Sequence, residues 1–184
     1  MDCGTDYDTS EACPICGFGR RQIGPLRLDT RNAPVELDLA RTIGGEIVAS
    51  AAFAEAFERG GLTGASFGPV EGTGSAPDLR WRQLFVGAAF DISARTRVGI
   101  SPVEDDETGR YVCPKGHVRG LNQLSELWIE DFPSGLDIAS ARQAFGMKEG
   151  LLYPEPAIVV SHRFREWAVG AKLRGIELGA VHKG

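Results

Sequence analysis

Two Cys-Pro segments, far apart along the chain, constrain its fold more than any other feature. Residues 13–17 read CPICG and residues 113–117 read CPKGH, so a glycine stands in the second segment where a second cysteine would be, and His117 follows it. Two thiolates separated by two residues suit adjacent vertices of a tetrahedral metal site. One such pair supplies only half of the ligands, so we expect the chain to fold with the two segments together.

These segments predict a structural zinc site of three cysteines and one histidine. The predicted ligands are Cys13, Cys16, Cys113 and His117, with Cys3 as the reserve ligand if His117 points away. An ion held in this way would tie the N-terminal arm to the middle of the chain and contribute folding free energy. In the alternative interpretation, Cys113 is a buried apolar residue, His117 is a turn residue, and Cys13 and Cys16 bind metal weakly or form a transient disulfide.

The pattern favours a structural role for this metal over catalysis. Four protein ligands leave no open position for water or substrate. A thioredoxin-like redox site would place its cysteine pair at the start of a helix, and a zinc deaminase would need a His-x-Glu element, which the sequence lacks. No Walker loop is present either. We therefore expect a protein that is not an enzyme.

Composition narrows the possible partners. The chain has 184 residues, a length that favours one domain, and its 42% hydrophobic and 24% charged residues are typical of a globular protein. Twenty lysines and arginines against 25 acidic residues give a net charge of −5, so no overall basic footprint favours nucleic acid. No apolar stretch approaches the ~20 residues of a membrane helix, and the acidic start does not resemble a signal peptide. We expect a cytoplasmic chain with reduced cysteines and no membrane partner.

A strand–helix–strand pattern occurs twice. Residues 46–49 predict a buried strand, Ser50 is placed to cap a helix that ends at Gly60 and Gly61, and residues 65–70 predict a second strand. The same pattern begins again at residue 157, so that Ser50 corresponds to Ser161. Nine residues are identical over the 25 aligned positions. An internal duplication is the favoured interpretation, although any capped amphipathic helix between two strands would look similar.

These units predict one α+β domain over residues 1–184, with a mostly antiparallel sheet and a zinc-knuckle element. We expect a zinc-knuckle arm at 1–45, the first repeat unit at 46–70, central strands with the second half of the zinc site at 81–150, and the second repeat unit at 157–181. In the central part, residues 81–92 predict one or two strands and residues 125–130 another strand. Residues 138–145 predict a short helix that stops at Gly146.

Together these residues resemble the double-CXXCG motif immunity proteins, a paralogous group known from myxobacteria. The resemblance rests on four stretches, namely residues 13–17, 47–70, 113–128 and 158–181. It implies a cytoplasmic antidote to polymorphic toxins that sibling cells exchange, acting by binding a cognate toxin domain. The chain departs from the family pattern at Gly116, so the motif carries over fully to residues 13–17 and in part to Cys113. His117 as a ligand is inferred from this sequence.

An acidic loop at residues 101–109 is the candidate partner surface. Its four carboxylates can steer association with a basic toxin cleft, although such a run is most often a solvated surface; they are Glu104, Asp105, Asp106 and Glu107.

Two other functions stay open. A zinc-ribbon module associated with nucleic acid or transcription would need a basic stripe near Cys13, where only Arg20 and Arg21 stand. A metal-dependent enzyme would need an exchangeable water on the metal.

Overall fold

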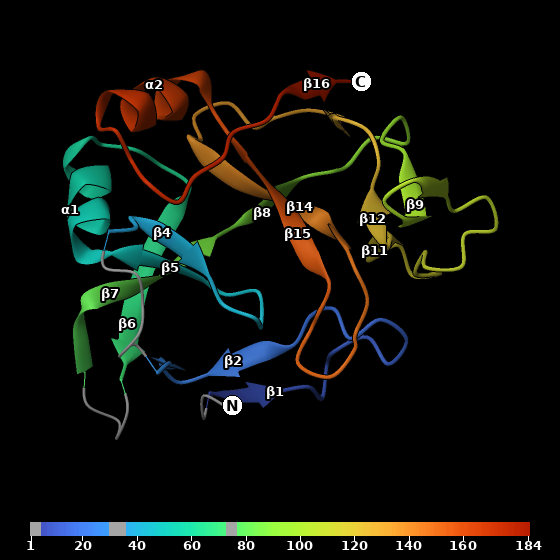
Figure 1. Ribbon diagram of the computed structural model, residues 1–184, viewed down its shortest axis with the longest axis horizontal. Coiled ribbons are helices and arrows are strands. Elements are labelled where there is room, and N and C mark those ends of the chain that lie inside the picture. Colours follow the sequence, from blue (N-terminus) through green and yellow to red (C-terminus); the bar gives the residue numbers. More distant parts are fainter. Residues whose placement is uncertain (1–4, 30–35, 73–76) are drawn as a thin grey trace.

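The computed structural model describes residues 5–29, 36–72 and 77–184. In these residues the chain is a mixed α/β protein built mostly of strands, with two short helices (Figure 1). Most strand pairs are antiparallel, and parallel pairs make two of the sheets mixed. The expected mixed class with mainly antiparallel pairing is confirmed at this level. No helix of the described residues is long and apolar enough to cross a membrane.

Both strands of the first predicted repeat unit lie in a five-stranded sheet. In chain order its strands are β3 (Leu26–Arg27), β4 (Leu39–Arg41), β5 (Ile47–Ser50), β6 (Ala65–Glu71) and β7 (Pro77–Val86). Across the sheet they lie in the order β3–β6–β7–β5–β4, and only β3 and β6 are parallel. One apolar cluster of this sheet contains Leu26, Val48, Val70 and Trp81. The strands predicted at 46–49, at 65–70 and at the start of 81–92 are confirmed.

A second sheet is built around one central strand. Its members are β8 (Ala88–Phe90), β11 (Val118–Gly120), β14 (Ile138–Phe145) and β15 (Glu155–Val160). Strand β14 pairs with β8 and β11 in parallel and with β15 in antiparallel fashion. The helix predicted at 138–145 is therefore wrong. Ala139, Ala141 and Ala144 are at most 1% exposed, and this central packing outweighs the helix propensity of an alanine-rich segment.

Three small sheets complete the pairing. Strand β1 (Asp6–Asp8) pairs with β2 (Arg21–Ile23), which holds the N-terminal arm together. Strand β9 (Val98–Ser101) lies between β10 (Glu104–Asp105) and β12 (Asn122–Gln123). Strand β13 (Leu127–Ile129) confirms the strand predicted at 125–130, and it pairs in parallel with β16 (Val181–Lys183) near the C-terminus.

The two helices are α1 (Ala51–Arg59) and α2 (His162–Gly170), and they lie side by side (Figure 1). Each begins at the predicted serine. The hydroxyl of Ser50 accepts the amide of Phe53 at 3.0 Å, and that of Ser161 accepts the amide of Phe164 at 3.1 Å. Aromatic side chains from both helices pack in one buried cluster, in which the rings of Phe57 and Phe164 are 6.3 Å apart.

The chain differs between the two units after each helix. The first unit continues into β6, whereas residues 171–180 form no strand and β16 begins only at Val181. Yet corresponding positions make corresponding contacts. The amide of Thr63 donates to the carboxylate of Asp137 at 3.0 Å, and the amide of Arg174 donates to that of Asp38 at 2.9 Å. These reciprocal contacts favour a duplication, which stays a prediction.

Candidate metal centre

The four predicted ligands lie together. The ligand atoms of Cys13, Cys16, Cys113 and His117 are all within 4.8 Å of one another. The sulfurs of Cys13 and Cys113 are 3.9 Å apart, and Nδ1 of His117 is 3.9 Å from the sulfurs of both Cys16 and Cys113. A tetrahedral ion with metal–sulfur bonds of ~2.3 Å places neighbouring sulfurs about 3.8 Å apart. The four side chains therefore match the dimensions of one tetrahedral metal site.

The donor set is buried and complete. Cys13, Cys16 and Cys113 are between 3% and 9% exposed, and none of them forms a disulfide. Three thiols and an imidazole are soft to borderline ligands, and together they fill all four positions of a tetrahedron. His117 occupies the fourth position, while the reserve ligand Cys3 lies outside the described residues. Such a site can hold a metal ion without leaving a coordination position for substrate.

The two cysteine segments fold into matching turns. The amide of Cys13 donates to the carbonyl of Phe18 at 2.8 Å, and the amide of Cys113 donates to that of Val118 at 3.0 Å, so each turn closes five residues after its cysteine. A glycine with positive φ lies in each turn, at 72° for Gly17 and 78° for Gly116. The histidine follows that glycine directly and reaches the cluster with its longer side chain.

The thiols differ in how readily they ionise. Backbone amides, first that of Cys16 and then that of Ile15, point at the sulfur of Cys13 and lower the pKa of its thiol. Burial raises the pKa of Cys16. Without metal, the cluster therefore carries its negative charge most readily at Cys13. An ion that binds all four ligands must displace protons from the remaining thiols, so its affinity falls as the pH is lowered.

Strand pairing places the second turn. Strand β11 continues directly from His117 and pairs with β14, with Val118 opposite Ala144. The carbonyl of His117 also accepts the amide of Ala144 at 2.9 Å. Val118 and Ala144 are at most 1% exposed and pack against the cysteines, while the ring of Phe18 stacks on the imidazole at 5.8 Å. The central strand of the second sheet thus holds one half of the ligand set.

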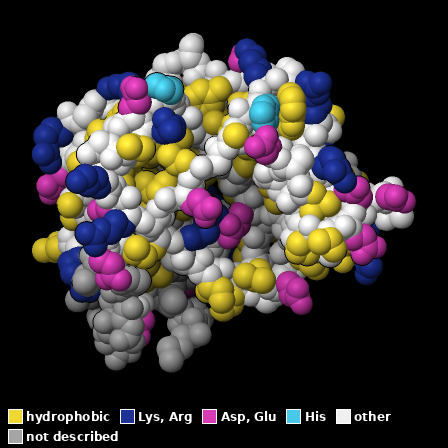
Figure 2. All heavy atoms as spheres, turned by 45° about the horizontal axis from the view of Figure 1, so that its top comes forward, with side chains coloured by type: hydrophobic (Ala, Val, Ile, Leu, Met, Phe, Trp, Pro, Cys, Tyr) yellow, Lys and Arg dark blue, Asp and Glu magenta, His cyan; other side chains and the backbone are white. Residues whose placement is uncertain are grey.

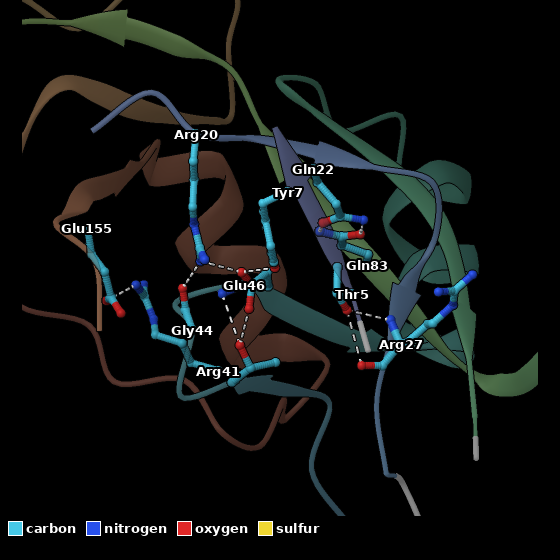
Figure 3. A network of polar contacts seen from close by, with 11 residues as sticks. Thr5, Tyr7, Arg20, Gln22, Arg27, Arg41, Gly44, Glu46, Gln83 and Glu155 are labelled. Carbon is cyan, nitrogen blue, oxygen red and sulfur yellow. Dashed lines mark hydrogen bonds and ion pairs between the residues drawn. The ribbon is translucent and has the colours of Figure 1, made fainter. Parts of the chain in front are cut away.

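Arg20 places the first turn (Figure 3). Its guanidinium lies over the rings of Tyr7 and Tyr153, at 3.9 and 3.8 Å from their centroids. It donates to the carbonyl of Gly44 at 2.5 Å and to the carboxylate of Glu46 at 2.7 Å. The charged side chains are only 15% and 12% exposed, so this pair is shielded from solvent. Arg20 therefore anchors the N-terminal arm four residues after Cys16.

Sequence reasoning missed this role of Arg20, because its partners come from three separate parts of the chain, around residues 7, 44–46 and 153. Glu46 is kept charged in the same network. Its burial favours the neutral form, but hydrogen bonds from Thr42 and Tyr7 and the charge of Arg20 outweigh burial and lower the pKa of Glu46. An arginine near an acidic residue in sequence would have been a usable signal, and here no such spacing exists.

The acidic loop is only partly a solvent-facing patch. The carboxylate of Asp106 accepts the amides of Arg110 at 2.9 Å and Tyr111 at 3.0 Å, and these bonds, led by that of Tyr111, lower the pKa of Asp106. Asp105 pairs with Arg97 at 2.6 Å. Asp106 therefore organises the turn, whereas the other three acidic side chains of the predicted surface are exposed, namely Glu104, Asp105 and Glu107.

Residues 64–68 read GASFG and match the Gly-x-Ser-x-Gly pattern of serine hydrolases. In those enzymes the serine sits on a sharp turn between a strand and a helix. Ser66 instead lies inside β6, where it pairs with Phe85 of β7. This serine has the geometry of an ordinary strand residue.

Comparisons with known proteins found no matching family model, no matching curated protein and no matching solved structure. The case for function therefore rests on the geometry of the metal centre and on the sequence resemblance.

Proposed function

We propose that this chain is a non-catalytic binding protein, an immunity protein that neutralises a cognate toxin by stoichiometric binding, and that its metal is structural zinc. One observation carries the proposal. Three buried thiols and an imidazole converge from two distant turns and complete a tetrahedral donor set. A closed set of this kind suits a scaffold and offers no open position for chemistry.

Zinc is the metal best matched to these donors. Structural zinc sites use Cys₄, Cys₃His or Cys₂His₂ ligands in tetrahedral geometry, and such an ion contributes folding free energy directly. Here it would join the turn at residues 13–18 to the turn at residues 113–118. An antidote benefits from such a rigid support, because a surface that is already ordered loses less entropy on binding.

The partner side of the proposal rests on the family resemblance and on charge. A net charge of −5 and the exposed carboxylates Glu104 and Glu107 complement a basic cleft of the kind found in toxins that attack nucleic acid. Asp105, also exposed, forms an ion pair with Arg97 on this surface, and Asp106 holds the turn through the amides of Arg110 and Tyr111. The protein would act in the cytoplasm, where the cognate toxin reaches its target.

The metal is tested by elemental analysis of protein purified without added metal. We expect one zinc per chain, and after replacement by cobalt a tetrahedral, thiolate-rich spectrum that does not change with added azide. Cys113→Ser should lose the ion, whereas Lys115→Ser, an exposed change in the same turn, should keep it. A spectrum that responds to azide would reveal an open position and would favour an enzyme.

The function is tested by searching beside this gene for a toxin gene and expressing the two proteins together. Co-expression should restore growth, and the purified pair should form a complex of fixed stoichiometry in light scattering. Replacing Glu104 and Glu107 by serine should slow association and weaken its salt dependence. The matched control replaces Glu55 and Glu58, exposed on α1, and should leave both unchanged. Neutralisation at far below equimolar amounts would contradict stoichiometric binding.

A further inference from the structure

A groove runs along one strand of the second sheet, away from the metal centre. It consists of two adjoining hollows of about 850 and 540 Å³, and both are lined by residues of β15. Figure 2 shows the surface hollowed here, with hydrophobic side chains on its walls. Arg41, which pairs with Glu155 (Figure 3), lines both hollows and lies where they meet. The larger hollow is bounded by β4 and by residues 176–181.

The backbone of β15 offers unused hydrogen-bonding groups to this groove. In an antiparallel pair, successive residues point their amide and carbonyl alternately toward and away from the partner strand. The amide of Ser161 donates to the carbonyl of Asp137 at 2.8 Å, so Ser161 and every second residue before it face β14. Val159 therefore bonds to β14, whereas Ile158 and Val160 direct their amides and carbonyls to the opposite edge.

No strand in residues 5–29, 36–72 or 77–184 pairs with that edge. The edge of β4 on the other side of the groove is already partly covered, because the amide of Leu39 donates to the carbonyl of Arg174 at 3.3 Å. Pro156, which has no amide hydrogen, lies within β15 and is typical of a strand with one free edge. The groove thus combines mostly apolar walls, with the Arg41–Glu155 ion pair where the hollows meet, and one unpaired strand edge.

We infer that this groove receives an extended, apolar segment of the partner protein, which adds to the free edge of β15 as a further strand. Backbone bonds to Ile158 and Val160 would give affinity, and the two hollows would take the alternating side chains. The six residues of β15 span about 20 Å, which matches a segment of about six residues. The inference rests on the proposed function only for the identity of that partner.

A second copy of this chain fits the groove poorly. For two copies to pair through the same strand, its edge must protrude from the surface, so that the two backbones can approach to about 4.8 Å. Here the edge of β15 is recessed between β4 and residues 176–181. Two recessed edges cannot meet, whereas one inserted strand can reach the floor of the groove.

Amide hydrogen exchange of the isotope-labelled protein tests the free edge. We expect the amides of Ile158 and Val160 to exchange rapidly and that of Val159 to be protected. Protection of all three amides in dilute protein would show that the edge is already paired and would overturn the inference. Protection that grows with protein concentration would do the same, because it would assign the edge to a second copy.

A peptide probe tests the added strand. The probe is acetyl-Thr-Val-Thr-Val-Thr-Val-amide, and its control is the same peptide with alternate amides methylated. We expect the unmodified peptide to slow exchange at Ile158 and Val160 and to bind about fivefold or more tightly than the methylated peptide, because each lost hydrogen bond costs about that factor. Equal binding of both peptides, or binding of neither, would overturn the inference.

Two variants test whether the peptide accepts a hydrogen bond from the amide of Ile158. Ile158→Pro removes the amide that faces the groove and leaves the bonds between β14 and β15 in place, so it should weaken peptide binding about fivefold. Ile158→Val keeps the amide and should bind like the wild type. Wild-type binding by the proline variant would contradict the inference. A protein that neutralises toxin but binds no peptide would refute only this inference, and peptide binding without neutralisation would refute only the proposed function.

Discussion

Two regions of the molecule join segments that are distant in sequence, and they do so by different means. The helix region brings α1 and α2 together through buried aromatic rings, among them Phe53, Phe57 and Phe164, each at most 2% exposed. The cysteine region joins its two turns with a smaller cluster. Within the part of the chain that the structure describes, its hydrophobic members besides the cysteines are Val118, Ala144 and the partly buried Phe18.

The difference indicates what each region requires to stay folded. Three buried phenylalanines remove enough apolar surface from water to hold the two helices together. Truncating a buried phenylalanine to alanine typically lowers the free energy of unfolding by about 3–5 kcal/mol. The cysteine cluster buries little besides its own thiols. Its ligand atoms lie within 4.8 Å of one another, so this cluster is stabilised most by an ion that neutralises the charge of its thiolates. The helix region should therefore be stable through packing, and the cysteine region through metal.

Removing the metal should have the largest effect and should fall on one region. Compared with the protein at saturating zinc, we expect the chelated protein to have a free energy of unfolding that is lower by on the order of 5–10 kcal/mol. Amide exchange should show lost protection at Cys13 and Cys113, whose amides close the two turns, while the amides of α1 and α2 keep theirs. Equal loss in both regions would contradict the separation.

The same ion should be released by acid. Thiolates and neutral imidazole are the metal-binding forms, so protons compete with the ion and the stability that it contributes is present at neutral pH and lost as the pH falls. Denaturation at several pH values, with and without chelator, should give two curves that converge at low pH. A gap between the curves that stays constant with pH would show that proton-binding ligands do not hold the ion.

Truncating Phe57 tests the opposite region. Its ring lies 5.6 Å from that of Phe67 and 6.0 Å from that of Trp167, so Phe57→Ala should cost about 3–5 kcal/mol in urea denaturation. The control Phe85→Ala removes a ring that is 44% exposed and should cost less than about 1 kcal/mol. Both variants should keep one metal per chain, and loss of metal from Phe57→Ala would couple the two regions.

Asp38 and Asp137, which accept the reciprocal backbone contacts of the two units, should differ in how much stability is lost when each is truncated. Asp137 has a side chain only 7% exposed and accepts from Thr63, Ser161 and Arg163, the last at 2.9 Å. Asp137→Ala leaves these donors unpaired and should cost about 2–3 kcal/mol, against about 1 kcal/mol for Asp38→Ala at its more exposed position. Thermal denaturation of both variants measures the difference, and equal losses would show that burial does not set it.

The parts that could be predicted from sequence are those with a local physical signal. Ser50 and Ser161 cap helices because a hydroxyl satisfies amides three residues away, and the cysteine spacing reflects the shape of one turn. Residues 138–145 were misread because their alanines favour a helix locally, and only the neighbouring strands make them a central strand. The anchoring role of Arg20 depends on aromatic rings contributed by distant segments, so no spacing could indicate it.

The helix caps should give the smallest effect and the sharpest test of equivalence between the two units. Ser50→Ala and Ser161→Ala each remove the bond that the hydroxyl accepts from a helix amide and the bond that it donates to an aspartate, Asp38 or Asp137. Each should cost about 1 kcal/mol in urea denaturation with zinc present. Threonine at either position keeps the hydroxyl and should recover most of the loss. The double variant should be additive, because the caps share no partner. Neither change should alter the cobalt spectrum, so a shifted spectrum would show that helix packing reaches the metal centre.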